Sequence, residues 1–271
     1  ILSLLSSNNI TLRLSSASAV ASGAARGTMK RAGDVGPDNI PVILCTTANC
    51  ATEMLIGGAT ITYTSNQLIN LIGLLGGLNF SIPLYLRTVP GQTVAAGTYT
   101  VTLNLAVTYR VCTGLSLPGI CLSLSDQNGS GTIPITVTMV VTNDCTTITA
   151  ADISFGSAPL VNSFSTVSQS ISVICTKDST YTVGVDNGTH AAGGVRRMAS
   201  GGNFLSYDIY KDSTTNRWGS VGAERRSSTT SSSVSGDGLT RTYNYTAKVL
   251  TTQNTPPAGN YTDSVIVDLS F

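Results

Sequence analysis

Few side chains of this sequence could perform acid–base or nucleophilic chemistry. The single histidine, His190, lies in the polar segment NGTHAAGG (187–194), and a general base needs partners that position it. Asp208 and Asp212 could act as paired carboxylates, but Lys211 lies between them, and a solvated turn explains them better. No GxSxG, GxGxxG or Walker sequence occurs. We therefore expect no catalytic residue and no cofactor, and we interpret the protein as a non-enzyme.

The six cysteines could bind a metal or form disulfides. No CxxC pair is present, so a zinc ribbon or a thioredoxin-like site has no support, and we expect no metal. An even count in a lysine-poor, serine- and threonine-rich chain favours disulfides and an oxidising compartment, with free cytosolic thiols as the less favoured alternative. Cys45 with Cys50 and Cys112 with Cys121 are close enough to staple loops, although spacing leaves a swapped pairing open.

Basic side chains form two short clusters, Arg196-Arg197 and Arg225-Arg226. Such clusters can dock an anionic sugar or a partner protein. Their glycine- and serine-rich surroundings favour the alternative, solvated loops.

Charged residues make up 11% of the chain and the formal net charge is +1, against roughly 25% charged residues in a typical soluble protein. Such a chain offers no electrostatic basis for binding nucleic acid or anionic lipid. No basic signal-peptide region precedes the strand-like pattern that opens at Ile1, so we expect the numbering to begin inside a processed chain.

The elements that must position these residues are strands. Segments rich in Val, Ile, Thr and Tyr alternate with period two, and clusters of Gly, Asn, Ser and Pro separate them. No segment shows a helical stripe with caps, so we expect an all-β fold. The predicted strands lie within 10–16, 59–65, 98–109, 133–142, 180–186, 239–250 and 261–271.

An internal repeat organises these strands into two related β-domains. AGTYTVTLNLAVTY (96–109) aligns without gaps on AGNYTDSVIVDLSF (258–271). Upstream, ITYTSNQLINLIG (61–73) aligns on YDIYKDSTTNRWG (207–219). The second alignment places Trp218 opposite the apolar Ile72, which predicts a core position for Trp218 rather than a ligand platform.

The two domains, 1–143 and 144–271, differ at their ends. In the first, the repeated strand is followed by a loop and a further strand at 133–142, whereas in the second it ends the sequence at Phe271. A sandwich that lacks a strand has an open edge which another chain can complete. We expect such a partner strand, with a sandwich of one strand fewer as the alternative. The first domain also looks short of an N-terminal strand.

The second domain contains a series of distinctive motifs. In order, they are NDCTTITAADISFGS (143–157), ISVICT (171–176), VRRM (195–198), LSYDIYKDSTTNRWG (205–219) and TPPAGNYTDSVIVDLSF (255–271). Together these motifs resemble the spore coat protein U domain, whose members form the subunits of archaic chaperone–usher pili. The first domain resembles the family only through the repeat.

The resemblance implies an immunoglobulin-like pilin domain that lacks its last strand. Its partners would be a periplasmic pilus chaperone, an outer-membrane usher and an adjacent pilin subunit that supplies a donor strand. Cys145 and Cys175 both fall in this domain and flank a strand-turn-strand region, so we pair them. The groove edge for the donor strand is expected along the last strand, at Tyr261, Val265, Val267, Leu269 and Phe271.

A charge-free stretch from Met54 to Leu86 contains LINLIGLLGGLNF (68–80). A membrane-spanning helix would need about twenty continuous apolar residues, but polar residues and Gly76-Gly77 interrupt this one, so we expect no transmembrane segment. The sister domain continues at this point with a polar loop (220–238). The apolar residues here are therefore expected in a loop: Leu74, Leu75 and Leu78.

A second apolar loop, CTGLSLPGIC (112–121), carries Leu115, Leu117 and Ile120. If the strands at 59–65, 80–87, 98–109 and 133–142 form a meander, both loops lie at the same pole. A patch of clustered apolar residues marks an interaction surface, unless the loops fold back and bury one another. The small-residue segment 16–27 is a third candidate whose position the sequence leaves open.

A two-domain chain with a divergent first domain is similar to the tip adhesin of archaic, Csu-type pili. We therefore expect an exported protein at the pilus tip on the cell surface, which binds hydrophobic abiotic or biotic surfaces and promotes biofilm formation. The alternatives are a glycan-binding tip lectin and a structural shaft or spore-coat subunit.

Overall fold

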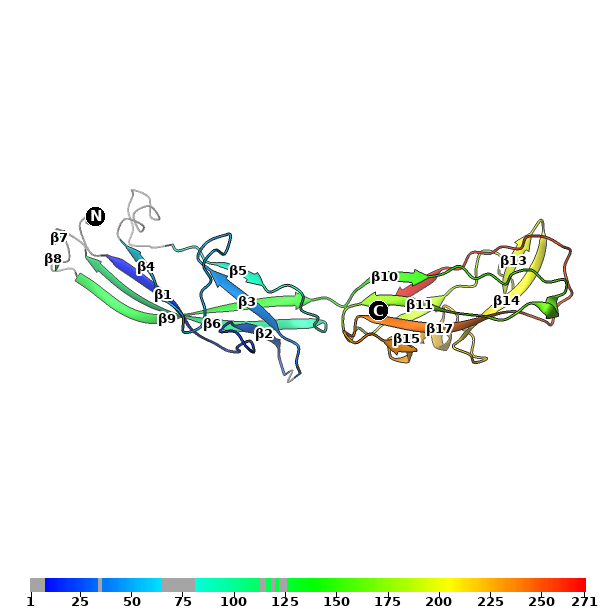
Figure 1. Ribbon diagram of the computed structural model, residues 1–271, viewed down its shortest axis with the longest axis horizontal. Coiled ribbons are helices and arrows are strands. Elements are labelled where there is room, and N and C mark those ends of the chain that lie inside the picture. Colours follow the sequence, from blue (N-terminus) through cyan, green and yellow to red (C-terminus); the bar gives the residue numbers. More distant parts are fainter. Residues whose placement is uncertain (1–7, 34–35, 65–80, 113–115, 118–119, 122–125) are drawn as a thin grey trace. The chain divides into compact units, whose positions relative to one another are not determined.

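The computed structural model describes residues 8–33, 36–64, 81–112, 116–117, 120–121 and 126–271 (Figure 1). Side chains are described for the same ranges except 112, 116–117, 120–121 and 126. The chain divides into two compact units, 1–141 and 142–271, and the boundary expected after residue 143 lies two residues from this division. The described residues form strands and short 3₁₀ turns without any α-helix, which confirms the all-β prediction.

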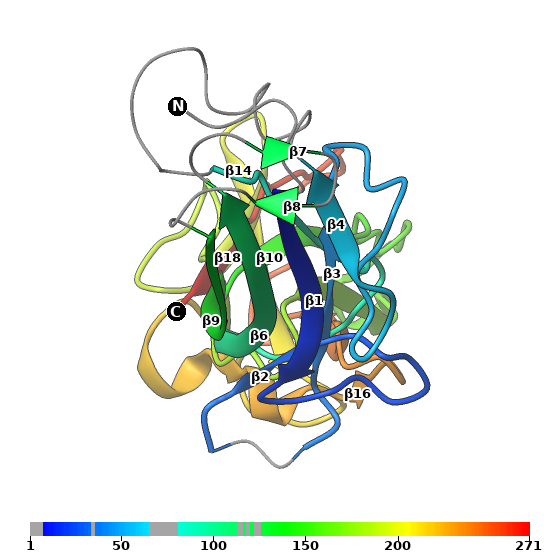
Figure 2. The ribbon, with the colours of Figure 1, turned by 90° about the vertical axis from the view of Figure 1, so that its left-hand side faces the viewer.

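Unit 1 is built around two long antiparallel strands, β6 and β9, which pair along their whole length (Figure 2). The opposite edge of β6 pairs with β1 and, further along, with β2. The strand β4 pairs with β1, while β3 links β2 to β5. The strands of unit 1 are β1 (Asn9–Ala17), β2 (Thr28–Arg31), β3 (Ile40–Cys45), β4 (Ile61–Thr64), β5 (Tyr85–Thr88), β6 (Gly97–Cys112), β7 (Ser116–Leu117), β8 (Ile120–Cys121) and β9 (Asp126–Val141).

The period-two alternation of the sequence decides which side chains enter the core of unit 1. Leu12 and Leu14 of β1 are buried beside Leu103 and Leu105 of β6, and Leu44 of β3 belongs to the same cluster. The strand β9 adds every second residue of its second half to this core, each half-buried: Ile135, Val137, Met139 and Val141.

The predicted meander is wrong except for its last pair of strands, β6 and β9. β4 pairs with β1 and β5 pairs with β3, so neither precedes β6 as its neighbour. The prediction assumed that strands close in sequence pair, which loop lengths do not guarantee. Both β4 and β6 nevertheless run antiparallel to β1, and Thr64 and Arg110 both lie opposite Asn9. The last residue of β4 and the C-terminal part of β6 therefore lie at the same end of the sheet.

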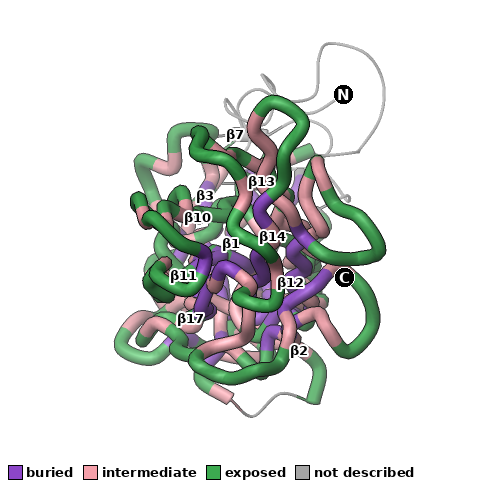
Figure 3. The backbone as a smooth tube through the Cα atoms, turned by 90° about the vertical axis from the view of Figure 1, so that its right-hand side faces the viewer, coloured by how far each residue is buried: buried purple, intermediate pink, exposed green. Residues whose placement is uncertain are grey.

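Unit 2 is a sandwich of two sheets, with the order β10-β11-β17-β14-β13 in one and β15-β12-β18 in the other. Buried stretches of its central strands are surrounded by exposed loops (Figure 3). Its strands are β10 (Cys145–Ala150), β11 (Val167–Cys175), β12 (Thr182–Val185), β13 (Arg196–Ser200), β14 (Asn203–Lys211), β15 (Arg226–Ser227), β16 (Ser233–Val234), β17 (Thr240–Val249) and β18 (Val267–Ser270), with 3₁₀ turns η1 (Val161–Ser163), η2 (Gly222–Glu224) and η3 (Ser228–Thr230).

Trp218 is the centre of the core of unit 2. Its side chain is fully buried, its Nε1 donates to the Val183 carbonyl at 3.0 Å, and its ring lies about 6 Å from those of Tyr243 and Tyr245. The predicted core role of this residue is confirmed.

Two of the expected disulfides are present. Cys45 is bonded to Cys50, and Cys145 is bonded to Cys175, which joins the edge strand β10 to β11. The expected pairing of Cys112 with Cys121 lies outside the residues whose side chains are described.

Candidate functional site

Each sheet of unit 2 ends at one side in a strand next to the chain segments 150–161 and 255–267. In the larger sheet this strand is β10, which pairs only with β11, and in the smaller sheet it is β18, which pairs only with β12 among the described strands. A free strand edge presents backbone N–H and C=O groups that another strand can use.

A groove runs between the chain segments that adjoin these two edges. It consists of a cavity of about 530 Å³ and a second one of about 520 Å³, which share Ile153, Phe155, Met198 and Tyr261 as lining residues. One wall is formed within residues 150–161 and the other within 255–267. We call this continuous feature the open groove.

The open groove exposes part of the hydrophobic core. Ile153, Phe155, Val265 and Val267 pack against the buried cluster but remain partly accessible, and Tyr245 of β17 contributes to the floor. Further burial of such partly exposed apolar side chains is favourable by about 25 cal/mol per Å² of apolar surface. The groove is therefore suited to an extended segment with alternating apolar side chains.

The residues predicted for the groove edge lie as follows. Tyr261, Val265 and Val267 line the open groove. Leu269 is half-buried against the core, whereas Phe271 is 64% exposed, with its ring 6.2 Å from that of Tyr181. Occupation of this edge by a donor strand remains a prediction.

The prediction missed Asp263, which lines the groove between Tyr261 and Val265. Its side chain is 2% exposed. One carboxylate oxygen accepts a hydrogen bond from the Tyr207 hydroxyl at 2.8 Å, and burial together with this bond raises the pKa of Tyr207. The period-two spacing of 261, 263, 265 and 267 was the available signal, but an acidic residue does not fit an apolar pattern.

His190 has a partner that the sequence did not suggest. Its Nδ1 lies 3.1 Å from Asp263 Oδ1, and its side chain is 38% exposed. Gly188 adopts a φ of +78° beneath this pair, and a side chain there would meet the Asp263 carboxylate. His190 thus lies in a partly exposed loop, and its contact with Asp263 holds the 261–264 segment.

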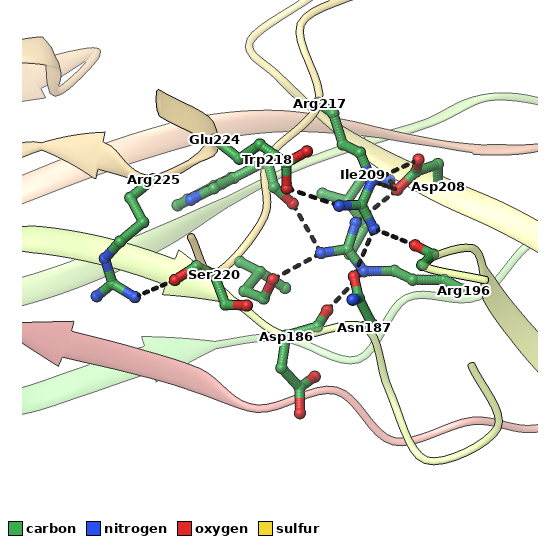
Figure 4. Close-up of polar contacts among 12 residues, drawn as sticks. Asp186, Asn187, Arg196, Asp208, Ile209, Arg217, Trp218, Ser220, Glu224 and Arg225 are labelled. Atoms are coloured by element: carbon green, nitrogen blue, oxygen red, sulfur yellow. Dashed lines mark hydrogen bonds and ion pairs between the residues drawn. The ribbon is translucent and has the colours of Figure 1, made fainter. Parts of the chain in front are cut away.

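Arg196 is fully buried, and Figure 4 shows the polar contacts around its guanidinium. Its guanidinium donates to the carbonyls of Asp186, Val185 and Trp218, each at 2.7 Å, and pairs with Asp208 at 2.5 Å. Burial lowers the pKa of Arg196, an effect that Asp208 opposes. Both interpretations of this arginine, a docking cluster and a solvated loop, are wrong, because carbonyls and a carboxylate from distant segments enclose it.

The ion-pair network extends from Asp208 through Arg217 to Glu224, with N–O distances of 2.9 and 2.7 Å. Asp208 is buried, so a solvated turn does not describe it. Arg225 pairs with Asp268 of β18 at 2.6 Å.

Arg226 is also buried and pairs with the more exposed Asp212. The second arginine cluster is thus part of the fold as well. Among the described residues no group of His, Cys, Asp and Glu side chains could hold a metal ion, and no helix there is long and apolar enough to cross a membrane.

The residues predicted to bind a surface are only partly covered by the structure. Leu74, Leu75, Leu78 and Leu115 lie outside the described residues. Leu117 and Ile120 pair across the β7–β8 hairpin, and their side chains are not described.

The third candidate, 16–27, leaves β1 at the opposite end of the sheet from Asn9, because Ala17 pairs with Leu103 whereas Asn9 pairs with Arg110. Segment 16–27 therefore begins at the opposite end of the sheet from Thr64 of β4 and Arg110 of β6.

Comparison with known proteins gives a family match and a structural match. The model of the Spore Coat Protein U domain matches residues 5–106 and 132–268. A solved structure of the CsuC–CsuE chaperone–tip adhesion subunit pre-assembly complex, from archaic chaperone–usher Csu pili of Acinetobacter baumannii, contains a similar chain with a TM-score of 0.59 and 25% sequence identity. The match covers 100% of this chain and 87% of that chain. No curated protein matches the sequence.

Proposed function

Because the chain belongs to the Spore Coat Protein U domain family, we propose that it is a chaperone–usher pilus subunit that forms the tip of the pilus and adheres to hydrophobic surfaces. The observation that carries this proposal is the open groove of unit 2, flanked by the free edges of β10 and β18. A donor strand from the adjacent pilin subunit would fill the groove in the pilus, and a periplasmic chaperone would fill it before assembly at an outer-membrane usher.

Unit 1 supplies an internal model for the filled groove. Its strand β6 is the repeat counterpart of β18 and pairs with β1 on one edge and with β9 on the other. In unit 2 the strand β18 pairs with β12 on one edge only. The position that β9 takes in unit 1 is therefore the position left for a donor strand in unit 2.

The β6–β9 register also predicts which donor residues enter the groove. In the repeat alignment Val265 corresponds to Leu103, which lies opposite Ile135 of β9. Val267 corresponds in the same way to Leu105, opposite Ile133. We expect an antiparallel donor strand with apolar residues at these alternate positions.

The strand pairing of the two units supports a position at the tip. Unit 1 obtains its last strand, β9, from its own chain, whereas among the described residues β18 of unit 2 has no second neighbour. A subunit of this kind could accept a neighbour through the groove of unit 2 and end the filament with unit 1.

Adhesion would reside in the apolar loops of unit 1, through Leu74, Leu75, Leu78, Leu115, Leu117 and Ile120. Each leucine that becomes fully buried in a contact contributes roughly 1.5–3 kcal/mol, and less on a flat surface. Several such residues would hold a hydrophobic surface without a shaped pocket and would promote biofilm formation.

The groove is tested by appending the β9 sequence 128–141 after Phe271 through a short turn. We expect this extension to raise the urea midpoint of unit 2, followed by the fluorescence of Trp218. A matched extension with Asp at the positions of Ile133 and Ile135 should not. Equal midpoints for both extensions would refute the donor-strand part of the proposal.

Adhesion is tested separately with Leu74→Ser, Leu75→Ser and Leu117→Ser combined. We expect weaker attachment to polystyrene at unchanged piliation, and unchanged attachment would exclude these loops. Inhibition by a soluble sugar would favour a tip lectin, and immunolabelling along the whole filament would identify a shaft subunit.

A further inference from the structure

Pro134 lies in the middle of β9, a strand of 16 residues. A proline has no N–H group for a ladder hydrogen bond, so within sheets it is confined to the first residue of a strand, to bulges and to edge strands. The pairing of β9 with β6 runs through Pro134 without a shift in register, so no bulge accommodates it. The position of this proline therefore depends on which side of β9 its backbone faces.

The backbone of Pro134 faces away from β6. The Ser18 amide donates to the Thr102 carbonyl at 2.9 Å, and the Thr102 amide donates to the Ser18 hydroxyl at 2.9 Å. The backbone groups of Thr102 thus face the side of β6 opposite to β9. In an antiparallel pair such residues alternate with those that bond to the neighbouring strand. Thr136, which lies opposite Thr102, and Pro134 therefore direct their backbone groups to the free side of β9.

The free side of β9 is otherwise suited to strand addition. Among the described residues β9 pairs only with β6 (Figure 2), and no charged residue lies between Gln127 and Asn143. The segment ITVTMVV (135–141) has the β-branched, uncharged composition of segments that pair readily with other strands.

The other end strands of the same sheet are protected in different ways. β4 and β5 have four residues each, and β5 contains Arg87. Short length, charged side chains, bulges and prolines are the features that prevent natural sheet edges from pairing with another chain. From Gln127 to its end, β9 has only the proline.

We propose that Pro134 is a specificity-determining residue, which closes the free edge of unit 1 to an incoming strand so that only unit 2 accepts one. The proline removes one hydrogen bond from the middle of any new ladder, and its ring occupies the place of the missing N–H. By contrast, β10 and β18, the strands beside the open groove, contain no proline. The inference rests on the proposed function only for the identity of the incoming strand, since the closure itself concerns unit 1 alone.

The test measures self-association of the full chain by sedimentation. Pro134 is exposed, so Pro134→Thr restores an N–H on the free side without changing the core. We expect this variant to dimerise edge to edge through β9, with a dissociation constant about tenfold or more below that of the wild-type chain, because each copy recovers one hydrogen bond. In the dimer the amides of Thr136 and Thr138 should gain protection from hydrogen exchange.

Two matched variants check the geometry. Pro134→Thr combined with Thr136→Pro moves the proline to the next position on the free side, and it should associate no more than the wild type. Ile135→Pro instead removes an N–H that faces Leu103 of β6, so hydrogen exchange of the β6 amides should become faster than in the double variant. If Pro134→Thr does not fold, Pro134→Ala takes its place.

Three results would overturn the inference. The first is association of Pro134→Thr no stronger than that of the wild type, and the second is a dimer that protects amides other than those of β9. The third is equal association of Pro134→Thr and the double variant. None of these measurements requires a donor strand in unit 2. Failure of the groove extension would therefore leave this inference standing, and failure here would leave the groove proposal in place.

Discussion

Replacing Arg196 by methionine should destabilise unit 2 strongly, because a single guanidinium holds three segments together. It donates to the carbonyls of Val185 and Asp186 at the end of β12, and to the carbonyl of Trp218. Val185 lines the open groove, so the substitution also loosens the floor of the proposed donor-strand site.

The magnitude follows from the groups left behind. Three carbonyls lose their charged donor, and each buried acceptor left unsatisfied costs about 1–3 kcal/mol. Asp208 keeps its contact with Arg217 at 2.9 Å, so its carboxylate is not left unpaired. Methionine refills part of the volume. We expect a loss of about 3–5 kcal/mol, the usual effect of removing one partner from a buried pair.

The measurement is urea unfolding followed by fluorescence. Trp218 is the single tryptophan of the chain and lies in the core of unit 2, so its emission reports this unit without a contribution from unit 1. Arg197→Met is the matched control. Its guanidinium donates to the His190 carbonyl and stacks on Phe204 at 4.1 Å, and its loss should cost about 1 kcal/mol or less.

The reasoning would be refuted if Arg196→Met lowered the free energy of unfolding by no more than Arg197→Met does. An intermediate variant sharpens the test. Arg196→Lys keeps the charge but has a single nitrogen, so it should recover the contact with Asp208 without restoring all three carbonyl bonds.

Three further outcomes are expected. Replacing Cys145 and Cys175 together by serine opens a loop of 30 residues and should cost roughly 3–4 kcal/mol; the double variant should match the reduced wild-type protein in urea, and an undiminished midpoint would contradict this. Alkaline pH should destabilise unit 2, because burial raises the pKa values of Tyr207 and Tyr243 in the folded state. The stability that these neutral tyrosines contribute is complete below the ordinary tyrosine pKa of about 10 and is lost as the pH rises above it, by up to about 1.4 kcal/mol per pH unit for each tyrosine. A free energy of unfolding that stays constant between about pH 9.5 and about pH 11.5 would contradict this. Val265→Asp should leave the isolated chain folded but abolish stabilisation by the appended β9 sequence, and full stabilisation of this variant would place the strand elsewhere.

The sequence predicts those features that depend on local patterning. Period-two alternation predicts β1, β4, β6, β9, β12, β17 and β18, but it does not identify β2, β3, β11, β13 or β14. The repeat identifies Trp218 as a core residue and β18 as a strand without its second neighbour. Pairing between distant strands is not encoded in a local pattern. For this reason the prediction of a meander failed at β4 and β5, which joined β1 and β3.

The charged residues show the same limit more clearly. Arg196 lies in a glycine-rich stretch that is typical of a solvated loop. Its hydrogen-bond partners Asp208 and Trp218 lie 12 and 22 residues later in the sequence. His190 and Asp263 are 73 residues apart. Burial of a charge is decided by which carbonyls and carboxylates the fold brings around it, and no window of the sequence contains that information.

The walls of the open groove are held by contacts that do not depend on a donor strand. The disulfide between Cys145 and Cys175 fixes β10 to β11. On the other side, Asp268 pairs with Arg225, and the Asp186 carboxylate accepts a hydrogen bond from the Ile266 amide at 2.8 Å. Apolar walls without such anchors would move together to bury their side chains. An entering strand therefore finds a groove that is already formed, which lowers the ordering cost of binding. Asp268→Asn should then weaken capture of an added β9 peptide more than it lowers the stability of unit 2, and equal losses in both measurements would show that this anchor serves the fold alone.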